Sequence, residues 1–388
     1  MNYIRLWVWE GPRGPLGRNL VPLWRRSPFA WPRTGPGLAN DGLPRFDLSR
    51  FDDSYFSRLR ARVAEAAASG IYVAVMLFGG VEHFMARIVA NGFPFDGDNN
   101  VNGIVCGGLR SQTLLDPQVL EIQERYVRKV IDTVNDLDNV LYEISNEAGP
   151  QSIEWQYHMI SVVKEHQARK RKQHPVGMSW VFDTRNDVLW NSDADWISPG
   201  GFDGFGHPPG AVEAKGDKVV INDSDHAFYY LRMKTVGPDG QRDWIWKSFT
   251  RGYNLAFMDP YLVEWPGRNV TFGTTLDSTW DVMRDGLGFT RDLAERVDMA
   301  TMVPRSELAS TGYCLASLQP EGEAFVLYLP SRDGGSLDLS GCPGTFAVEL
   351  LDTRSGHYFP GEDVTGGDTR HFTHPFDQSC VVYMRRKA

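Results

Sequence analysis

The stretch NVLYEISNEAG, residues 139–149, decides the fold of this 388-residue chain. Its first part, VLYEIS, is short, apolar and rich in β-branched and aromatic residues, which predicts a strand buried on both faces. The apolar run ends at Asn146 and Glu147, so polar groups follow directly on the strand. Side-chain alternation places Glu143, Ser145 and Glu147 on one face and Asn146 on the other.

Further runs of the same kind lie on both sides of this strand. The other predicted strands are residues 3–9, 71–78, 176–181, 195–198, 218–222 and 253–258. Apolar residues at three- and four-residue spacing predict helices at residues 55–69, 117–135, 153–171 and 279–297. This alternation of strand and helix is typical of parallel βα units.

The residues after the strand ends favour a closed barrel over a doubly wound sheet. No GxGxxG or GxxxxGK turn follows any strand, whereas acidic residues gather there, on the face where barrels place their active sites. We therefore predict an α/β fold with a (β/α)8 barrel of the TIM type. Only seven strands are apparent, so the first barrel strand is expected to be missing or replaced within residues 11–50. That segment lacks periodicity and suits a substrate-binding loop.

The pattern changes near the C-terminal end of the chain. From Glu307 onward, short alternating strands are separated by GlyGly, ProGly and SerGly turns. We predict a barrel catalytic domain over residues 1–303 and a small antiparallel β-sandwich over residues 304–388.

Composition excludes several classes of partner and site. Apolar residues make up 42% and charged residues 23%, as in compact soluble domains. The net charge of -9 leaves no basic stripe for nucleic acid, and no apolar run reaches the roughly 18 residues of a membrane span. The four cysteines have no metal-ligand spacing, so neither a metal nor another cofactor is expected. Three of the cysteines lie near the C-terminus, where the sequence allows one disulfide.

Glu147 is the first candidate for catalysis. A carboxyl at a barrel mouth can protonate a departing glycosidic oxygen and then deprotonate water, and the Asn146 carboxamide can bind a sugar hydroxyl. The alternative is a structural Glu stabilised by the dipole of the following helix. The segment KVVINDSDH offers Asp223 and Asp225 as the second carboxylate, with Asp223 preferred; at least one of the two is expected to cap its own turn.

Supporting residues lie at other strand ends. Arg5 can pair with the nucleophilic carboxylate and lower its pKa, or form a structural ion pair. The remaining substrate-binding candidates are Trp7, Trp9, Glu10, His83, His226 and Asp259. Aromatic faces in this set suit stacking on sugar rings, and the polar groups suit hydroxyls.

Together, NYIRLWVWE, NVLYEISNEA, HPVGMSW, DWISPGG, KVVINDSDHAF and WKSFTRGYNLAFMDPY resemble the cellulase-like, family 5-like glycoside hydrolases of clan A. The similar branch carries a C-terminal β-sandwich named for collagen binding. The resemblance implies Glu147 as acid/base, a nucleophile at Asp223 or Asp225, and Arg5 as the arginine of the second barrel strand. The clan normally uses Glu as nucleophile, so Asp is a departure. The resemblance also implies an extracellular or periplasmic location, although the chain shows no signal peptide.

These observations predict an O-glycoside hydrolase with a retaining mechanism, acting on an oligo- or polysaccharide of plant or microbial origin. A transglycosidase shares the covalent intermediate and remains an alternative, as does a catalytically inactive carbohydrate-binding barrel. A metal-dependent hydrolase is disfavoured because no HisxHis or HisGluxxHis spacing is present.

Overall fold

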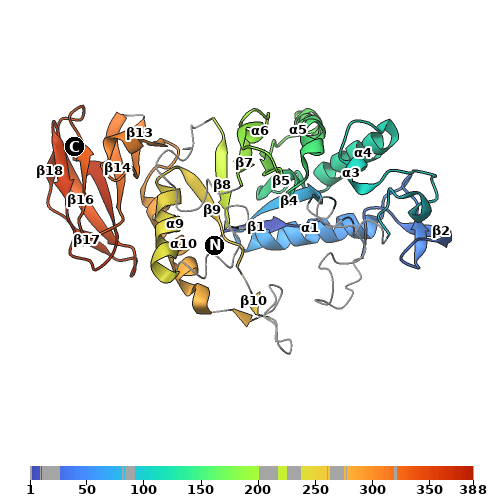
Figure 1. Cartoon of the computed structure of the whole chain (residues 1–388), viewed down its shortest axis with the longest axis horizontal. Coiled ribbons are helices and arrows are strands. Elements are labelled where there is room, and N and C mark those ends of the chain that lie inside the picture. Colours follow the sequence, from blue (N-terminus) through green and yellow to red (C-terminus); the bar gives the residue numbers. More distant parts are fainter. Residues whose placement is uncertain are drawn as a thin grey trace. The chain divides into compact units, whose positions relative to one another are not determined.

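The predicted alternation of strands and helices is present along the chain (Figure 1). The computed structural model describes residues 2–8, 10, 27–80, 83, 92–200, 217–224, 237–259, 261–262, 275–276, 278–318 and 321–387. The chain divides into two compact units, Asn2–Ser198 and Pro199–Ala388, and the second also includes Met1.

The first unit is built on parallel strands. They are β1 (Tyr3–Leu6), β4 (Tyr72–Phe78), β5 (Val140–Ser145), β6 (Val176–Ser179) and β7 (Trp196–Ser198). Each pairs in parallel with the next, in the order β1-β4-β5-β6-β7. The register sets Arg5 opposite Ala74, and Met76 opposite Glu143. The carboxyl ends of these strands therefore meet at one edge.

Helices follow these strands and pack beside them (Figure 1). They are α1 (Asp53–Ala68), α3 (Gly108–Ser111), α4 (Pro117–Val134), α5 (Ile153–Gln167) and α6 (Asp187–Trp190). Asp52 caps α1 by accepting from the Ser54 amide, and Asp116 caps α4 ahead of Pro117. A hairpin of β2 (Arg33–Leu38) and β3 (Pro44–Phe46) lies within residues 11–50, where the sequence predicted a loop or a replacement for the first barrel strand; these two strands pair with each other as a separate antiparallel sheet.

The second unit begins with two more parallel strands. Strand β8 (Val219–Asp223) pairs with β9 (Tyr253–Ala256), and the helix between them is α9 (Gly237–Phe249). Helix α9 is not among the helices predicted from the sequence, whereas the following helix, α10 (Asp281–Arg296), is. Strands β10 (Tyr261–Leu262) and β11 (Thr275–Leu276) form a short antiparallel pair.

An antiparallel sheet domain completes this unit. Its main sheet runs in the order β12-β13-β14-β20-β16-β17, with β18 also paired to β16, and β15 pairs with β19. The bounds are β12 (Met302–Pro304), β13 (Cys314–Leu318), β14 (Glu321–Leu329), β15 (Gly335–Asp338), β16 (Thr345–Asp352), β17 (Tyr358–Pro360), β18 (Val364–Thr365), β19 (Thr369–Phe372) and β20 (Cys380–Arg386). No disulfide joins any of the four cysteines, so the one that the sequence allowed near the C-terminus is not formed.

The main antiparallel sheet is buried on both faces. Along β14, Val326 and Tyr328 pack in a cluster with Trp244 and Met283 from helices α9 and α10. The alternate residues Phe325, Leu327 and Leu329 pack in a second cluster, with side chains next to β15 and β19. This is why β14 is a continuous apolar run instead of an alternating one.

The predicted fold class is confirmed. The described residues contain seven parallel strands of a TIM-type barrel, alternating with helices, and antiparallel sheets elsewhere. Within the described part of the chain, no helix is both long and apolar enough to cross a bilayer.

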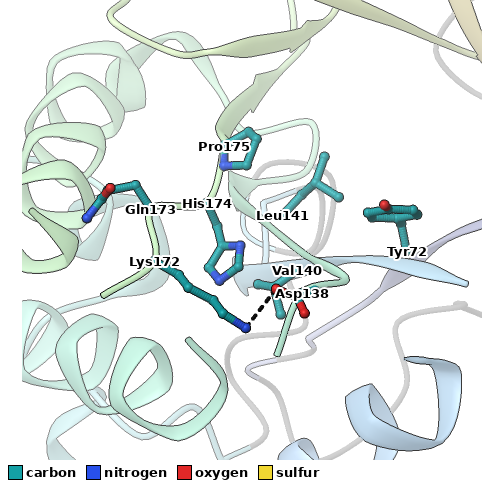
Figure 2. Close-up of a pocket in the computed structure, with 8 residues that line it drawn as sticks. All are labelled: Tyr72, Asp138, Val140, Leu141, Lys172, Gln173, His174 and Pro175. Atoms are coloured by element: carbon teal, nitrogen blue, oxygen red, sulfur yellow. Dashed lines mark ion pairs between the residues drawn. The ribbon is translucent and has the colours of Figure 1, made fainter. Parts of the chain in front are cut away.

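A depression opens at the amino ends of β4, β5 and β6, at the opposite end of these strands from Glu147 (Figure 2). Its volume is about 470 Å³. The lining residues are Tyr72, Asp138, Val140, Leu141, Lys172, Gln173, His174 and Pro175.

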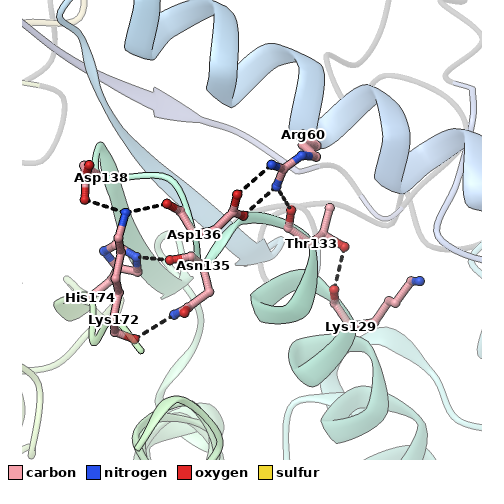
Figure 3. A network of polar contacts seen from close by, with 8 residues as sticks. All are labelled: Arg60, Lys129, Thr133, Asn135, Asp136, Asp138, Lys172 and His174. Atoms are coloured by element: carbon pink, nitrogen blue, oxygen red, sulfur yellow. Dashed lines mark hydrogen bonds and ion pairs between the residues drawn. The ribbon is translucent and has the colours of Figure 1, made fainter. Parts of the chain in front are cut away.

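A polar network holds the loop before β5 next to this depression (Figure 3). Arg60 on α1 forms two hydrogen bonds of 2.6 and 2.7 Å with the carboxylate of Asp136. Hydrogen bonding to Arg60 lowers the pKa of Asp136 from its ordinary 3.8 to about 2. Lys172 pairs with Asp138 at 2.7 Å and also donates to the Asp136 carbonyl.

We predict that Gly177→Ala destabilises the first unit. A Cβ at Gly177 would lie 1.9 Å from Cε2 of Trp196 on the paired strand β7, so the buried indole must move. The expected loss in the free energy of unfolding is about 1 to 3 kcal/mol, measured by urea denaturation.

Gly288→Ala is the matched control for this prediction. Gly288 lies inside α10, and an added Cβ would meet nothing within 4 Å. This substitution is expected to leave stability unchanged or raise it by about 0.5 to 1 kcal/mol. Equal effects of the two substitutions would contradict the steric explanation.

We predict that Arg60→Met lowers stability at pH 7 more than at pH 2. The pKa of Asp136 is depressed in the folded chain, so its contribution is fully present above about pH 4 and disappears as pH falls towards 2. Both side chains are about half exposed, which limits the effect to at most about 1 kcal/mol. Urea unfolding at pH 7, 4 and 2 measures it. Arg62→Met, whose contact with Glu65 is 3.4 Å, is the control, and a pH-independent loss for Arg60→Met would refute the linkage.

Candidate active site

Glu147 lies on a turn directly after the carboxyl end of β5. Its backbone has a positive φ of 50°, a conformation that costs a residue other than glycine about 1 to 3 kcal/mol and persists only where the surrounding structure enforces it. The strand itself ends at Ser145. The side-chain alternation predicted for the strand therefore does not extend to Glu147, and that prediction is wrong at this position.

Two neighbouring segments hold this turn in place. Gly80, just after β4, approaches so closely that a Cβ there would lie 1.9 Å from the Asn146 carbonyl oxygen. On the other side, the Phe182 amide donates to the Ala148 carbonyl at 2.9 Å. Glu147 is half-buried, while Asn146 and Ala148 are buried. The backbone that carries Glu147 is thus fixed from two sides.

Arg5 connects the turn to a buried carboxylate. Its Nε donates to Oε2 of Glu143 at 3.0 Å, and its Nη2 donates to Oε1 of Glu143 and, at 2.5 Å, to Oδ1 of Asn146. Ser179 on β6 also donates to Glu143. The side-chain exposure is 8% for Arg5 and 0% for Glu143, so this is a buried ion pair.

Arg5 thus bonds to both Glu143 and Asn146, which the sequence analysis placed on opposite faces of one strand. The reason is the same break in strand geometry after Ser145. Glu143 was not singled out as a functional residue, although a lone carboxyl inside the apolar run VLYEIS was a usable signal. The guanidinium of Arg5 also lies 5.2 Å from the centre of the Trp7 ring.

Glu10 and His83, predicted separately, lie together at the end of β4. Oε2 of Glu10 accepts from the Gly79 amide at 2.9 Å and lies 2.9 Å from Nε2 of His83. The Gly79 carbonyl in turn accepts from the Ser145 hydroxyl at 2.8 Å. Both Glu10 and His83 are buried, and these contacts link them through the β4 end to the strand that leads to Glu147.

Asp223 and Asp259 lie in the second unit. Asp223 is the last residue of β8, is 4% exposed and pairs in register with Ala256. Asp259 accepts two hydrogen bonds from Arg284, of 2.8 and 2.6 Å. The Asp259 carboxylate is thus held by a structural partner that the sequence did not identify. Trp9, Asp225 and His226 lie outside the described residues.

The described residues contain no group of three or more His, Cys, Asp or Glu side chains arranged to hold a metal ion. What the first unit does bring together is a half-buried carboxyl, an oriented carboxamide and a buried ion pair, all at the carboxyl ends of parallel strands. This arrangement can hold an acid next to groups that bind hydroxyls.

Comparison with known proteins identifies similar structures but no similar sequence. No protein-family model and no curated protein matches this chain. A family 5 glycoside hydrolase from Bacteroides vulgatus ATCC 8482 has a TM-score of 0.59 at 13% identity, covering 86% of this chain and 74% of its own. A second structure from that bacterium, assigned provisionally as a glycoside hydrolase, has a TM-score of 0.62 at 12% identity, covering 100% and 73%.

A maltogenic α-amylase from Thermotoga neapolitana is also similar, with a TM-score of 0.50 at 12% identity, covering 100% of this chain and 91% of its own. At identities this low, the three likenesses show a shared barrel fold. The fold supports many chemistries, so function has to be argued from the site.

We predict that breaking the Arg5–Glu143 pair is costly. Glu143→Met leaves the Arg5 charge buried without its carboxylate, so the free energy of unfolding should fall by about 3 to 5 kcal/mol. Combining Glu143→Met with Arg5→Met removes both charges and should recover much of that loss. Urea denaturation of the single and double variants measures the coupling.

The control is Arg50→Ala, which removes an exposed ion pair with Asp47 and is expected to cost at most about 1 kcal/mol. A Glu143→Met loss as small as that of the control would show that the buried pair does not hold the site.

Proposed function

We propose that this chain is a glycoside hydrolase in which Glu147 is the general acid/base. The observation that carries the proposal is the conformation of Glu147, held at positive φ beyond β5 between Gly80 and Phe182. Strained backbone of this kind clusters at active sites and ligand-binding sites, where it pre-organises the side chain. The carboxyl ends of the strands are also where barrel enzymes carry their chemistry.

Glu147 would serve in two steps. As an acid it protonates the glycosidic oxygen while the bond to the sugar breaks, and as a base it then takes a proton from the attacking water. Its half-buried position suits a group that must exchange protons with substrate and water. Arg5 holds the carboxamide oxygen of Asn146, which orients the amide nitrogen as a donor for a sugar hydroxyl.

We assign the second carboxylate to the end of β8, to Asp223 or to Asp225, with Asp223 first. In a retaining enzyme this group attacks the anomeric carbon, and its oxygen replaces the departing sugar oxygen. Water then releases the sugar with the anomeric configuration restored. Asp is shorter than Glu by one methylene, so its carboxylate reaches less far. The end of β8 must therefore lie closer to the sugar than it would with Glu at this position.

The remaining candidates would bind substrate. Trp7, beside Arg5, offers a flat ring for a sugar face, and Glu10 with His83 offers a buried hydrogen-bonding pair. Trp9, His226 and Asp259 complete the proposed set. The substrate is an oligo- or polysaccharide, in keeping with the glycoside hydrolases that share the fold. We assign the catalytic domain to residues 1–303 and the C-terminal β-sandwich to residues 304–388, as structural support.

The proposal predicts that Glu147→Ala abolishes cleavage of aryl glycosides. Release of p-nitrophenol from a panel of p-nitrophenyl glycosides is measured for the wild type, Glu147→Ala and Asp223→Ala. Loss of the acid/base should lower kcat by about 10² to 10⁴-fold, and sodium azide should restore turnover of Glu147→Ala as a β-glycosyl azide. Azide should give no such product with Asp223→Ala.

Glu154→Ala is the control, because Glu154 is an exposed carboxyl on α5, and its kcat should match the wild type. A wild type that cleaves no glycoside in the panel, or a Glu147→Ala variant with unchanged kcat, would refute the proposal. An azide product of inverted configuration would refute the retaining mechanism alone. Transfer of the sugar to an added acceptor in preference to water would identify a transglycosidase.

A further inference from the structure

The depression at the amino ends of β4, β5 and β6 is an open hollow lined by eight residues (Figure 2). Its volume of about 470 Å³ falls in the range of roughly 300 to 1,000 Å³ that such sites occupy. Val140, Leu141 and Pro175 supply apolar surface, while Asp138 and Lys172 supply polar groups. An apolar lining with a few polar groups is the usual composition of a ligand pocket.

Hydrogen bonds hold the His174 side chain and the backbone on the polar side of the depression (Figure 3). Nε2 of His174, which is 7% exposed, lies 2.8 Å from the backbone carbonyl of Asn135, and the side-chain Nδ2 of Asn135 donates to the Lys172 carbonyl at 3.0 Å. Gln173 donates to the Lys170 carbonyl at 2.9 Å. Side chains and backbone held in this way lose little entropy when a ligand binds.

The charges of the lining cancel locally. Lys172 and Asp138 are its two charged side chains with opposite sign, and they pair at 2.7 Å. Asp136, behind the rim, is paired with Arg60. A site with balanced charges has no preference for an anion or a cation, so it favours an uncharged ligand.

Tyr72 supplies the remaining element. It is the first residue of β4, and half of its surface, 50%, is exposed. Figure 2 shows its ring on one side of Leu141, with Lys172 and Gln173 on the other. An exposed aromatic face beside donors and acceptors suits the two sides of a sugar ring, whose C–H face is apolar and whose edge carries hydroxyls.

We propose that this depression is a second saccharide-binding site, specific for uncharged sugars and separate from the site of Glu147. Tyr72 stacks on a sugar ring, and Asp138, Lys172 and Gln173 bind its hydroxyls. The choice of a sugar as ligand rests on the proposed function. Such a site would hold one part of a long substrate while another part is cleaved.

Calorimetry with the full chain tests this. The probes are the neutral tetrasaccharides cellotetraose, mannotetraose, galactotetraose and arabinotetraose, and the parent is Glu147→Ala, which prevents turnover. Adding Tyr72→Ala should raise the Kd of at least one probe by about fivefold or more. Tyr72→Phe keeps the ring and should retain binding, and Leu115→Ala, which removes an exposed apolar side chain elsewhere, should have no effect.

Cleavage of aryl glycosides by Tyr72→Ala, made without the Glu147 substitution, should equal that of the wild type. Identical isotherms with and without Tyr72→Ala, or no binding of any tetrasaccharide, would overturn the proposal. So would tighter binding of anionic tetragalacturonate at this site, or a Tyr72→Ala effect confined to self-association in sedimentation velocity. If Tyr72-dependent binding is found but no glycoside is cleaved, the second site stands and the hydrolase proposal alone fails.

Discussion

The site depends on one buried ion pair, Arg5 with Glu143. Two charges removed from water are tolerated only when they pair and when hydrogen bonds satisfy what remains. Here Ser179 and Asn146 provide those bonds, so side chains from β1, β5, β6 and the turn after β5 must all be in register. The pair therefore specifies the relative positions of the strands more than it adds to their stability. A shift of any one strand would leave a charge unsatisfied.

Steric constraint completes what the ion pair begins. Gly80 leaves room for the Asn146 carbonyl at a distance that no side chain would permit. The residue after Asn146, Glu147, has a left-handed backbone conformation. A small residue just after β4 therefore helps to set the direction of the Glu147 carboxyl just after β5. Glu10 and His83 connect to the same region through Gly79. The end of β4 therefore contacts both the Glu10–His83 pair and the strand that leads to Glu147.

Much of the fold could be read from the sequence, because buried parallel strands are continuous apolar runs that need no tertiary information. The strand VLYEIS and its neighbours, and helices such as α4 with strong apolar spacing, fall close to their predicted bounds. Helix α9 was missed since it begins with GlyPro and has no cap signal of its own, and the β2–β3 hairpin lacks alternation. Within the site, Glu147, Asn146 and Arg5 were identified as candidates, but their contacts were not. The Arg5–Glu143 ion pair and the Glu10–His83 contact join residues on different strands or on the segments that follow them. Local sequence pattern does not encode the distances between strands, so it could not predict these contacts.

The antiparallel sheet has a consequence for how this protein can be divided. One face of β14 is covered by α9 and α10 and the other by residues near β15 and β19, so this central strand has no face open to water. If the chain were cut after α10, the side chains of Trp244, Met283 and their neighbours would become exposed to solvent. The separated sheet would also expose the apolar side chains that pack against them. The C-terminal strands are therefore not a detachable module. Evolution could exchange them only together with the helices on which they rest.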